Sequence, residues 1–106
     1  MKEIAIKKLI GREVLIRVPV QYGKLSKKSR RCEIINIEKV DYKEAGIYPE
    51  DCDNQPFFKV TFRICKGEKS AGRKFSYYYP LQILKAFEAN EKIKTTIIDT
   101  QIYTKR

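Results

Sequence analysis

The segment that decides the fold of this 106-residue chain runs Phe57-Phe58-Lys59-Val60-Thr61-Phe62-Arg63-Ile64-Cys65. From Phe58 to Ile64 every second side chain is large and apolar, and the side chains between them are polar or charged. Successive side chains of a β-strand point to opposite faces, so this alternation is typical of a strand with one buried face. The segment therefore predicts a strand over Phe57–Cys65 with its apolar face in the core.

A second strand is predicted directly after this one. Lys66–Gly72 is polar and holds two glycines, which is typical of a hairpin loop. Arg73–Tyr79 then alternates again, with Phe75 and two tyrosines on the core face and Tyr78 on the outer face.

The C-terminal part of the chain predicts one helix and one further strand. Pro80 suits the first turn of a helix, and apolar side chains recur after it at helical spacing. We therefore expect a helix over about residues 80–90. The alternating, β-branched segment Thr95–Tyr103 predicts a terminal strand.

Further strands are predicted N-terminal to this region. Glu13–Val20 carries a valine or isoleucine at every second position. Cys32–Tyr42 is a longer apolar segment whose isoleucines do not alternate strictly, and a bulge or bend near Asn36–Glu38 would reconcile them. Glu3–Lys8 predicts a short strand, whereas residues 44–56, rich in turn-forming residues, predict a long acidic loop.

Together these elements predict a mainly β, β-rich α+β fold. It would be either a small Src-homology-3-like barrel or a strongly bent antiparallel sheet with one C-terminal helix. The length suits a single domain over residues 1–106.

One segment resembles a known class of fold. The opening strand Leu9-Ile10-Gly11-Arg12-Glu13-Val14-Leu15-Ile16 is similar to the first strand of Tudor-like and Src-homology-3-like small β-barrels. A long loop, further strands and a closing strand that runs into Pro80-Leu81 extend the resemblance. It implies a barrel core over about residues 9–84. It also implies that loops and an exposed strand face bind nucleic acids or peptides, but it carries over no individual binding residue.

The composition disfavours several classes of protein. No apolar run approaches the ~18 residues of a membrane-spanning helix, and no signal-peptide pattern follows the basic start. The chain has no His, and its cysteines (Cys32, Cys52 and Cys65) form no C-x-x-C pair. We therefore expect a cytoplasmic protein that is not an enzyme and that holds neither a metal nor a cofactor.

The formal net charge of +10 is distributed unevenly along the chain. Residues 1–31 hold ten basic and two acidic side chains, residues 32–56 two basic and seven acidic, and residues 57–87 seven basic and one acidic. Clustered like charges produce a local field, whereas interspersed charges cancel. The segregation predicts a positively charged surface, and the alternative is that each run is a solvated loop.

Two cationic clusters are the strongest functional signal. Lys24-Leu25-Ser26-Lys27-Lys28-Ser29-Arg30-Arg31 is typical of an exposed, mobile loop, and the predicted hairpin supplies the second cluster. If both lie at one end of the fold, they form a continuous positive surface that binds phosphates with release of counterions. The candidate contacts are Lys24, Lys27, Lys28, Arg30, Arg31, Lys66, Lys69, Arg73 and Lys74.

Two tyrosines are candidates for stacking on unpaired bases, as in surfaces that bind single strands. Tyr78 is the outward aromatic side chain of its predicted strand, and Tyr22 lies beside the first cationic cluster. Packing within the protein is the alternative for Tyr78.

Two functions are predicted as alternatives. The first is a small module that binds DNA or RNA through the phosphate backbone with weak sequence preference, because lysine, a point charge, outnumbers arginine 16 to 7. The second is a non-enzymatic protein-binding adaptor or inhibitor of a larger nucleic-acid-processing complex. It would dock its basic face on an acidic protein surface, or add a sheet edge to a partner. The acidic segment 32–56 favours this second function, and the sequence indicates no oligomeric state.

Overall fold

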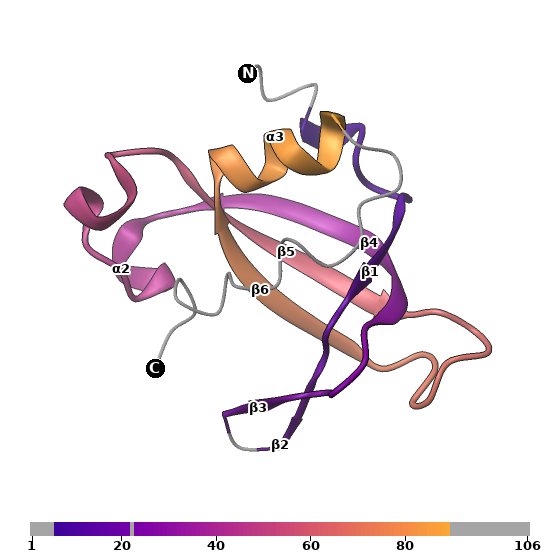
Figure 1. The fold of residues 1–106 in the computed structure, drawn as a ribbon. Coiled ribbons are helices and arrows are strands. Elements are labelled where there is room, and N and C mark those ends of the chain that lie inside the picture. Colours follow the sequence, from indigo (N-terminus) through magenta and orange to yellow (C-terminus); the bar gives the residue numbers. More distant parts are fainter. Residues whose placement is uncertain (1–5, 22, 90–106) are drawn as a thin grey trace.

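The structure, a computed structural model, describes residues 6–21 and 23–89 of the chain. Figure 1 shows a twisted sheet with a helix lying across one face. The elements in chain order are β1 (Glu13–Ile16), β2 (Pro19–Gln21), β3 (Lys24–Leu25), β4 (Arg30–Val40), α2 (Tyr42–Ala45), the 3-10 helix η1 (Pro49–Cys52), β5 (Phe57–Ile64), β6 (Lys74–Pro80) and α3 (Leu81–Ala89). The fold is β-rich α+β, as predicted.

Four strands form one antiparallel sheet in the order β1-β4-β5-β6, and β2 and β3 pair in a separate ribbon. Because β1 and β6 lie at the two edges, the sheet of the described residues is not closed into a barrel. Of the two predicted architectures, the bent antiparallel sheet is the one that the structure adopts (Figure 1).

The core lies between one face of the sheet and α3. β5 confirms the predicted alternation, because its core-facing side chains are all buried: Phe58, Val60, Phe62 and Ile64. From α3, Leu84 and Phe87 are fully buried against this face. The rings of Phe87 and Tyr79 pack edge to face with centroids 5.7 Å apart.

A bulge in β4 lets two unequally spaced isoleucines face the same core. Ile34 pairs with Phe62 and Asn36 with Thr61, so Ile35 is the extra residue. In a regular strand Ile34 and Ile37, which are both buried, would point to opposite faces. The bulge predicted near Asn36–Glu38 therefore exists, one residue earlier.

The acidic segment between β4 and β5 is not the predicted loop, because it forms two short helices, α2 and η1. The Asp41 carboxylate accepts a hydrogen bond from the Glu44 backbone N–H at 2.7 Å and so caps α2. Ala45 of α2 and Cys52 of η1 are buried against Phe57. Single-turn helices have little stability of their own, so capping and burial hold this segment.

The predicted strand Glu13–Val20 is divided into two strands. β1 ends at Ile16 and β2 begins at Pro19. Between them lies Val18, which is fully buried in the core.

The described part of the N-terminus is also helical rather than extended. Residues 6–10 form a turn in which the Leu9 N–H donates to the Ile6 carbonyl at 3.0 Å, where the sequence predicts a strand over Glu3–Lys8. Ile6 and Leu9 are three positions apart, and the helical turn buries both against the core.

At the C-terminal side, the helix predicted over residues 80–90 is confirmed as α3. Pro80 ends β6 rather than opening the helix, which begins at Leu81. The predicted strand Thr95–Tyr103 lies outside the described residues.

Candidate nucleic-acid interface

The two predicted cationic clusters lie side by side in the folded chain. The Arg30 guanidinium donates to the Lys69 carbonyl at 3.2 Å, and the Arg31 guanidinium donates to the Lys66 carbonyl at 2.9 Å. These bonds join the start of β4 to the loop between β5 and β6. They therefore connect segments that are 35 or more residues apart in the sequence.

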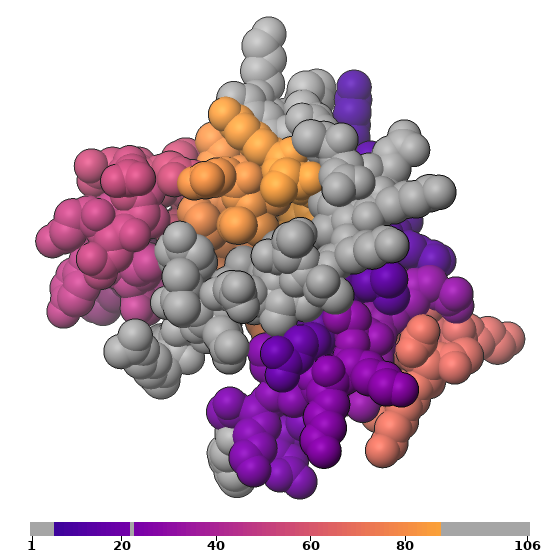
Figure 2. All heavy atoms as spheres, in the orientation of Figure 1, coloured from indigo at the N-terminus to yellow at the C-terminus, as the bar shows by residue number. Residues whose placement is uncertain are grey.

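We call the surface formed by residues 24–31 and 66–74 the basic end. Figure 2 shows the two segments adjoining, in violet and salmon. They hold nine cations and one carboxylate, that of Glu68. Eight of these cations are exposed, and Arg30 is half-buried. The bonds of Arg30 and Arg31 to backbone carbonyls position both side chains without neutralising them.

Ser26 anchors the first of these segments, for which the composition predicts an exposed, mobile loop. Its hydroxyl accepts from the Val18 N–H at 3.0 Å and donates to the Lys28 carbonyl at 2.7 Å. The Ser26 N–H donates in turn to the Val18 carbonyl at 2.7 Å. Ser26 is buried, so these bonds are shielded from water and hold the segment in one conformation.

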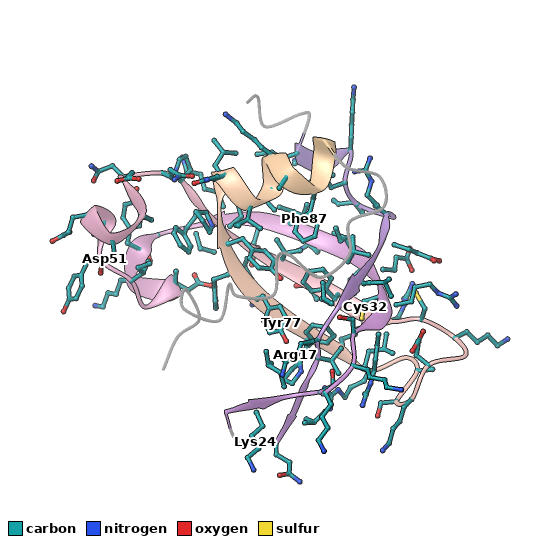
Figure 3. All side chains as sticks on the ribbon, in the orientation of Figure 1. Arg17, Lys24, Cys32, Asp51, Tyr77 and Phe87 are labelled. Carbon is teal, nitrogen blue, oxygen red and sulfur yellow. The ribbon has the colours of Figure 1, made fainter. Side chains whose placement is uncertain are left out.

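Further bonds hold the β2-β3 ribbon against β6. The Tyr77 hydroxyl donates to the Arg17 carbonyl at 2.7 Å, and Figure 3 shows the two residues next to each other. Burial raises the pKa of Tyr77, so its hydroxyl stays a protonated donor. The Arg73 guanidinium donates to the Pro19 carbonyl. Arg17, whose Nε donates to the Ser26 carbonyl at 2.7 Å, adds a cation beside the basic end.

The structure does not bring Tyr78 to the basic end. Its side chain is half-buried against the cluster around Phe57, and its hydroxyl lies 3.4 Å from the Glu44 carboxylate. The packing alternative therefore describes its position. Tyr22 lies outside the described residues.

A groove opens on the solvent face of the sheet beside the basic end, and we call it the outer groove. Its volume is about 510 Å³. Two ion pairs lie in it: Arg31 Nε is 3.4 Å from Glu13 Oε1, and Arg63 Nη2 is 2.8 Å from Glu33 Oε1. The lining residues are Glu13, Arg31, Glu33, Arg63, Ile64, Cys65, Lys66, Ala71 and Gly72.

Sequence reasoning missed three charged residues of this groove: Glu13, Glu33 and Arg63. The alternation places Arg63 on the outer face, but it does not identify a partner. The register does, because Glu33 stands opposite both Glu13 on β1 and Arg63 on β5. These contacts depend on the pairing of strands that are distant in the sequence, so no local sequence pattern predicts them.

The thiols near this surface are not activated. Burial raises the pKa of the Cys32 thiol to about 12. Burial also raises the pKa of Cys65, although a hydrogen bond from Arg31 acts in the opposite direction. Both thiols are therefore neutral at pH 7 and poor nucleophiles. Within residues 6–21 and 23–89, no group of three Cys, Asp or Glu side chains is placed to hold a metal ion.

The acidic residues gather away from the basic end. We call residues 41–53, which hold five carboxylates and one lysine, the acidic end. Figure 1 shows α2 of this segment at one side of the molecule and the loop between β5 and β6, which belongs to the basic end, at the other side. Glu50 and Asp51 consequently do not neutralise the cationic clusters.

Fold and surface together define a β-rich α+β protein with a preorganised cationic end and an opposing acidic end. Neither a known protein family, nor a curated protein, nor a solved structure matches this chain. Among the described residues, no helix has the length and apolar character to cross a membrane.

Proposed function

We propose that this protein is a small, non-enzymatic nucleic-acid-binding module that contacts the phosphate backbone of DNA or RNA through its basic end. The observation that carries the proposal is the pair of bonds that joins the two cationic clusters, Arg30 to Lys69 and Arg31 to Lys66. Two clusters side by side present a stronger field to a polyanion than either cluster alone.

The different contacts of the arginines and the lysines in the basic end support binding with weak sequence preference. Its three arginines direct guanidinium donors to backbone carbonyls or to a carboxylate of the protein itself. Its six lysines are exposed point charges, which suit phosphates better than base edges. Because Ser26 already orders the first cluster, binding costs less conformational entropy.

The cysteines support a reducing compartment for this function. Cys32, Cys52 and Cys65 are all free thiols. Free thiols persist in the cytoplasm, so we place the protein there.

A salt titration with a basic-end variant tests the proposal. Affinity for a labelled oligonucleotide, measured by fluorescence anisotropy, falls steeply between about 50 and 200 mM salt. In the Lys27→Gln/Lys28→Gln variant, affinity is lower and the slope of log affinity against log salt is shallower by about one to two. Both lysines are exposed, so the variant keeps its fold.

The matched control removes the same charge elsewhere. Lys39→Gln/Lys43→Gln changes two exposed lysines, one just before the acidic end and one within it, and its affinity stays close to wild type. An equal loss in both variants would show that net charge, not the basic end, drives binding. Absence of binding at about 50 mM salt would contradict the proposal outright.

A second candidate is a protein-binding adaptor or inhibitor of a nucleic-acid-processing complex. The separate acidic end favours it, because a pure polyanion binder gains nothing from five clustered carboxylates. Recovery of such a complex from a nuclease-treated host lysate, without any direct oligonucleotide binding, would support this candidate over the first.

A further inference from the structure

The outer groove has a charge pattern that phosphate binding does not explain. Its volume of about 510 Å³ falls within the range of about 300–1,000 Å³ that is typical of ligand sites. Glu13 and Glu33 stand opposite each other across β1 and β4 and both line it. The groove therefore places two hydrogen-bond acceptors among the cations Arg31, Arg63 and Lys66, which suits a ligand that carries hydrogen-bond donors as well as negative charge.

Both carboxylates keep acceptor capacity for such a ligand. Glu13 and Glu33 contact their arginines through Oε1. An ionised carboxylate offers about four lone-pair sites over its two oxygens, so Oε2 of each glutamate can accept from a ligand. The 2.8 Å hydrogen bond from Arg63 also restricts the position of the Glu33 carboxylate.

The two arginines of the groove supply planar faces. The Cys65 N–H donates to the Arg31 carbonyl at 2.9 Å, and Arg63 pairs with Glu33, so the two arginines are diagonal neighbours on β4 and β5. Such neighbours lie about 7–8 Å apart, within reach of two long side chains that contact one ring. Guanidinium groups stack on base rings.

We propose that the outer groove binds an unpaired guanine base of the nucleic acid whose phosphates contact the basic end, an inference that rests on the proposed function. Guanine offers two adjacent donors on its pairing edge, at N1 and N2, which match a carboxylate. Each of the other bases offers one donor group there, and a duplex hides the edge altogether. Lys66 belongs to both the groove and the basic end, so base and phosphate sites are continuous.

Anisotropy with short labelled oligothymidylates tests this site. One strand contains a single central guanine, and its affinity for the protein is about tenfold higher than that of the all-thymine strand. Replacing guanine by hypoxanthine removes the N2 donor and most of the preference. Replacing it by 7-deazaguanine leaves the pairing edge, and hence the preference, intact.

Glu33→Gln is the matching protein variant, and Glu38→Gln is its control on the same strand, outside the groove. Glu33→Gln abolishes the guanine preference while all-thymine binding persists, whereas Glu38→Gln keeps the preference; thermal unfolding checks the fold of both. Equal affinity of the wild type for both strands, or a preference that survives Glu33→Gln, would overturn the guanine site and leave phosphate binding standing. Binding of neither strand at low salt would overturn both proposals.

Discussion

Ser26 illustrates how one small side chain organises a charged surface. It is a buried polar residue, and its hydroxyl bonds to two backbone groups. Ser26→Ala leaves the buried Val18 N–H without this acceptor and lowers the free energy of unfolding by about 1–3 kcal/mol. Urea denaturation measures the change. The variant also weakens oligonucleotide binding, because the following cations lose their fixed positions.

Ser29→Ala is the control for this prediction, since Ser29 lies in the same segment and is half-buried rather than buried. Its stability and affinity stay close to wild type. An equal effect of the two substitutions would refute the role assigned to Ser26.

Cys32 makes stability depend on alkaline pH. Burial raises its pKa from an ordinary value of 9.0 to about 12 in the folded protein. Above about pH 9 the unfolded chain loses this proton while the folded chain keeps it, so stability falls as the pH rises towards 12. Cys32→Val removes this contribution, so the stability of the variant decreases less with rising pH than that of the wild type. Thermal unfolding across this pH range measures the difference. Identical profiles for variant and wild type would contradict the assignment. Tyr77, whose pKa burial also raises, contributes in the same direction and preserves part of the slope.

At the level of elements, Phe87 is one of the two fully buried side chains that hold α3 to the sheet. The ring is fully buried against Tyr79, and the Arg12 guanidinium donates to the Phe87 carbonyl. Phe87→Ala leaves a cavity and lowers the free energy of unfolding by about 3–5 kcal/mol, measured by urea denaturation. Lys85→Ala on the exposed side of α3 stays within about 0.5 kcal/mol of wild type. A loss below 1 kcal/mol for Phe87→Ala, about the scale of a surface change, would mean that α3 is not part of the core.

The sequence predicts those elements whose own periodicity carries the information. β5, β6 and α3 each repeat an apolar position often enough to indicate both type and face. The sequence does not predict the helices α2 and η1, because each is a single turn without its own periodicity. Tertiary burial of Ala45 stabilises α2, and tertiary burial of Cys52 stabilises η1. The pattern requires a bulge between Ile34 and Ile37 but does not locate it, because an extra residue anywhere between them restores the alternation.

The candidate site is likewise predictable from the sequence only in part. Local charge density indicates both cationic clusters of the basic end. The ion pairs Glu13–Arg31 and Glu33–Arg63 depend on strand order and register, so they become visible only in the folded chain. For Tyr78 the alternation predicts the correct face of the sheet but not its burial. The helices α2 and η1, which the sequence does not predict, cover that face.

For the molecule as a whole, the separation of the charged ends determines when the acidic end affects binding. The molecule extends 38 × 31 × 20 Å, whereas the Debye length is about 8 Å at physiological salt and about 30 Å at 0.01 M. Glu50→Gln/Asp51→Gln therefore leaves oligonucleotide association unchanged at physiological salt and accelerates it at about 0.01 M, as stopped-flow mixing would show. Acceleration at both salt concentrations would place the acidic end in the interface itself.

If the proposed function holds, the opposed ends also determine what a strand covered by this protein presents to its surroundings. With the cations of each copy turned inward to the phosphates, the carboxylates of residues 41–53 face outward. Under the proposed function, this outer layer of carboxylates repels a second strand of nucleic acid on that side of each copy.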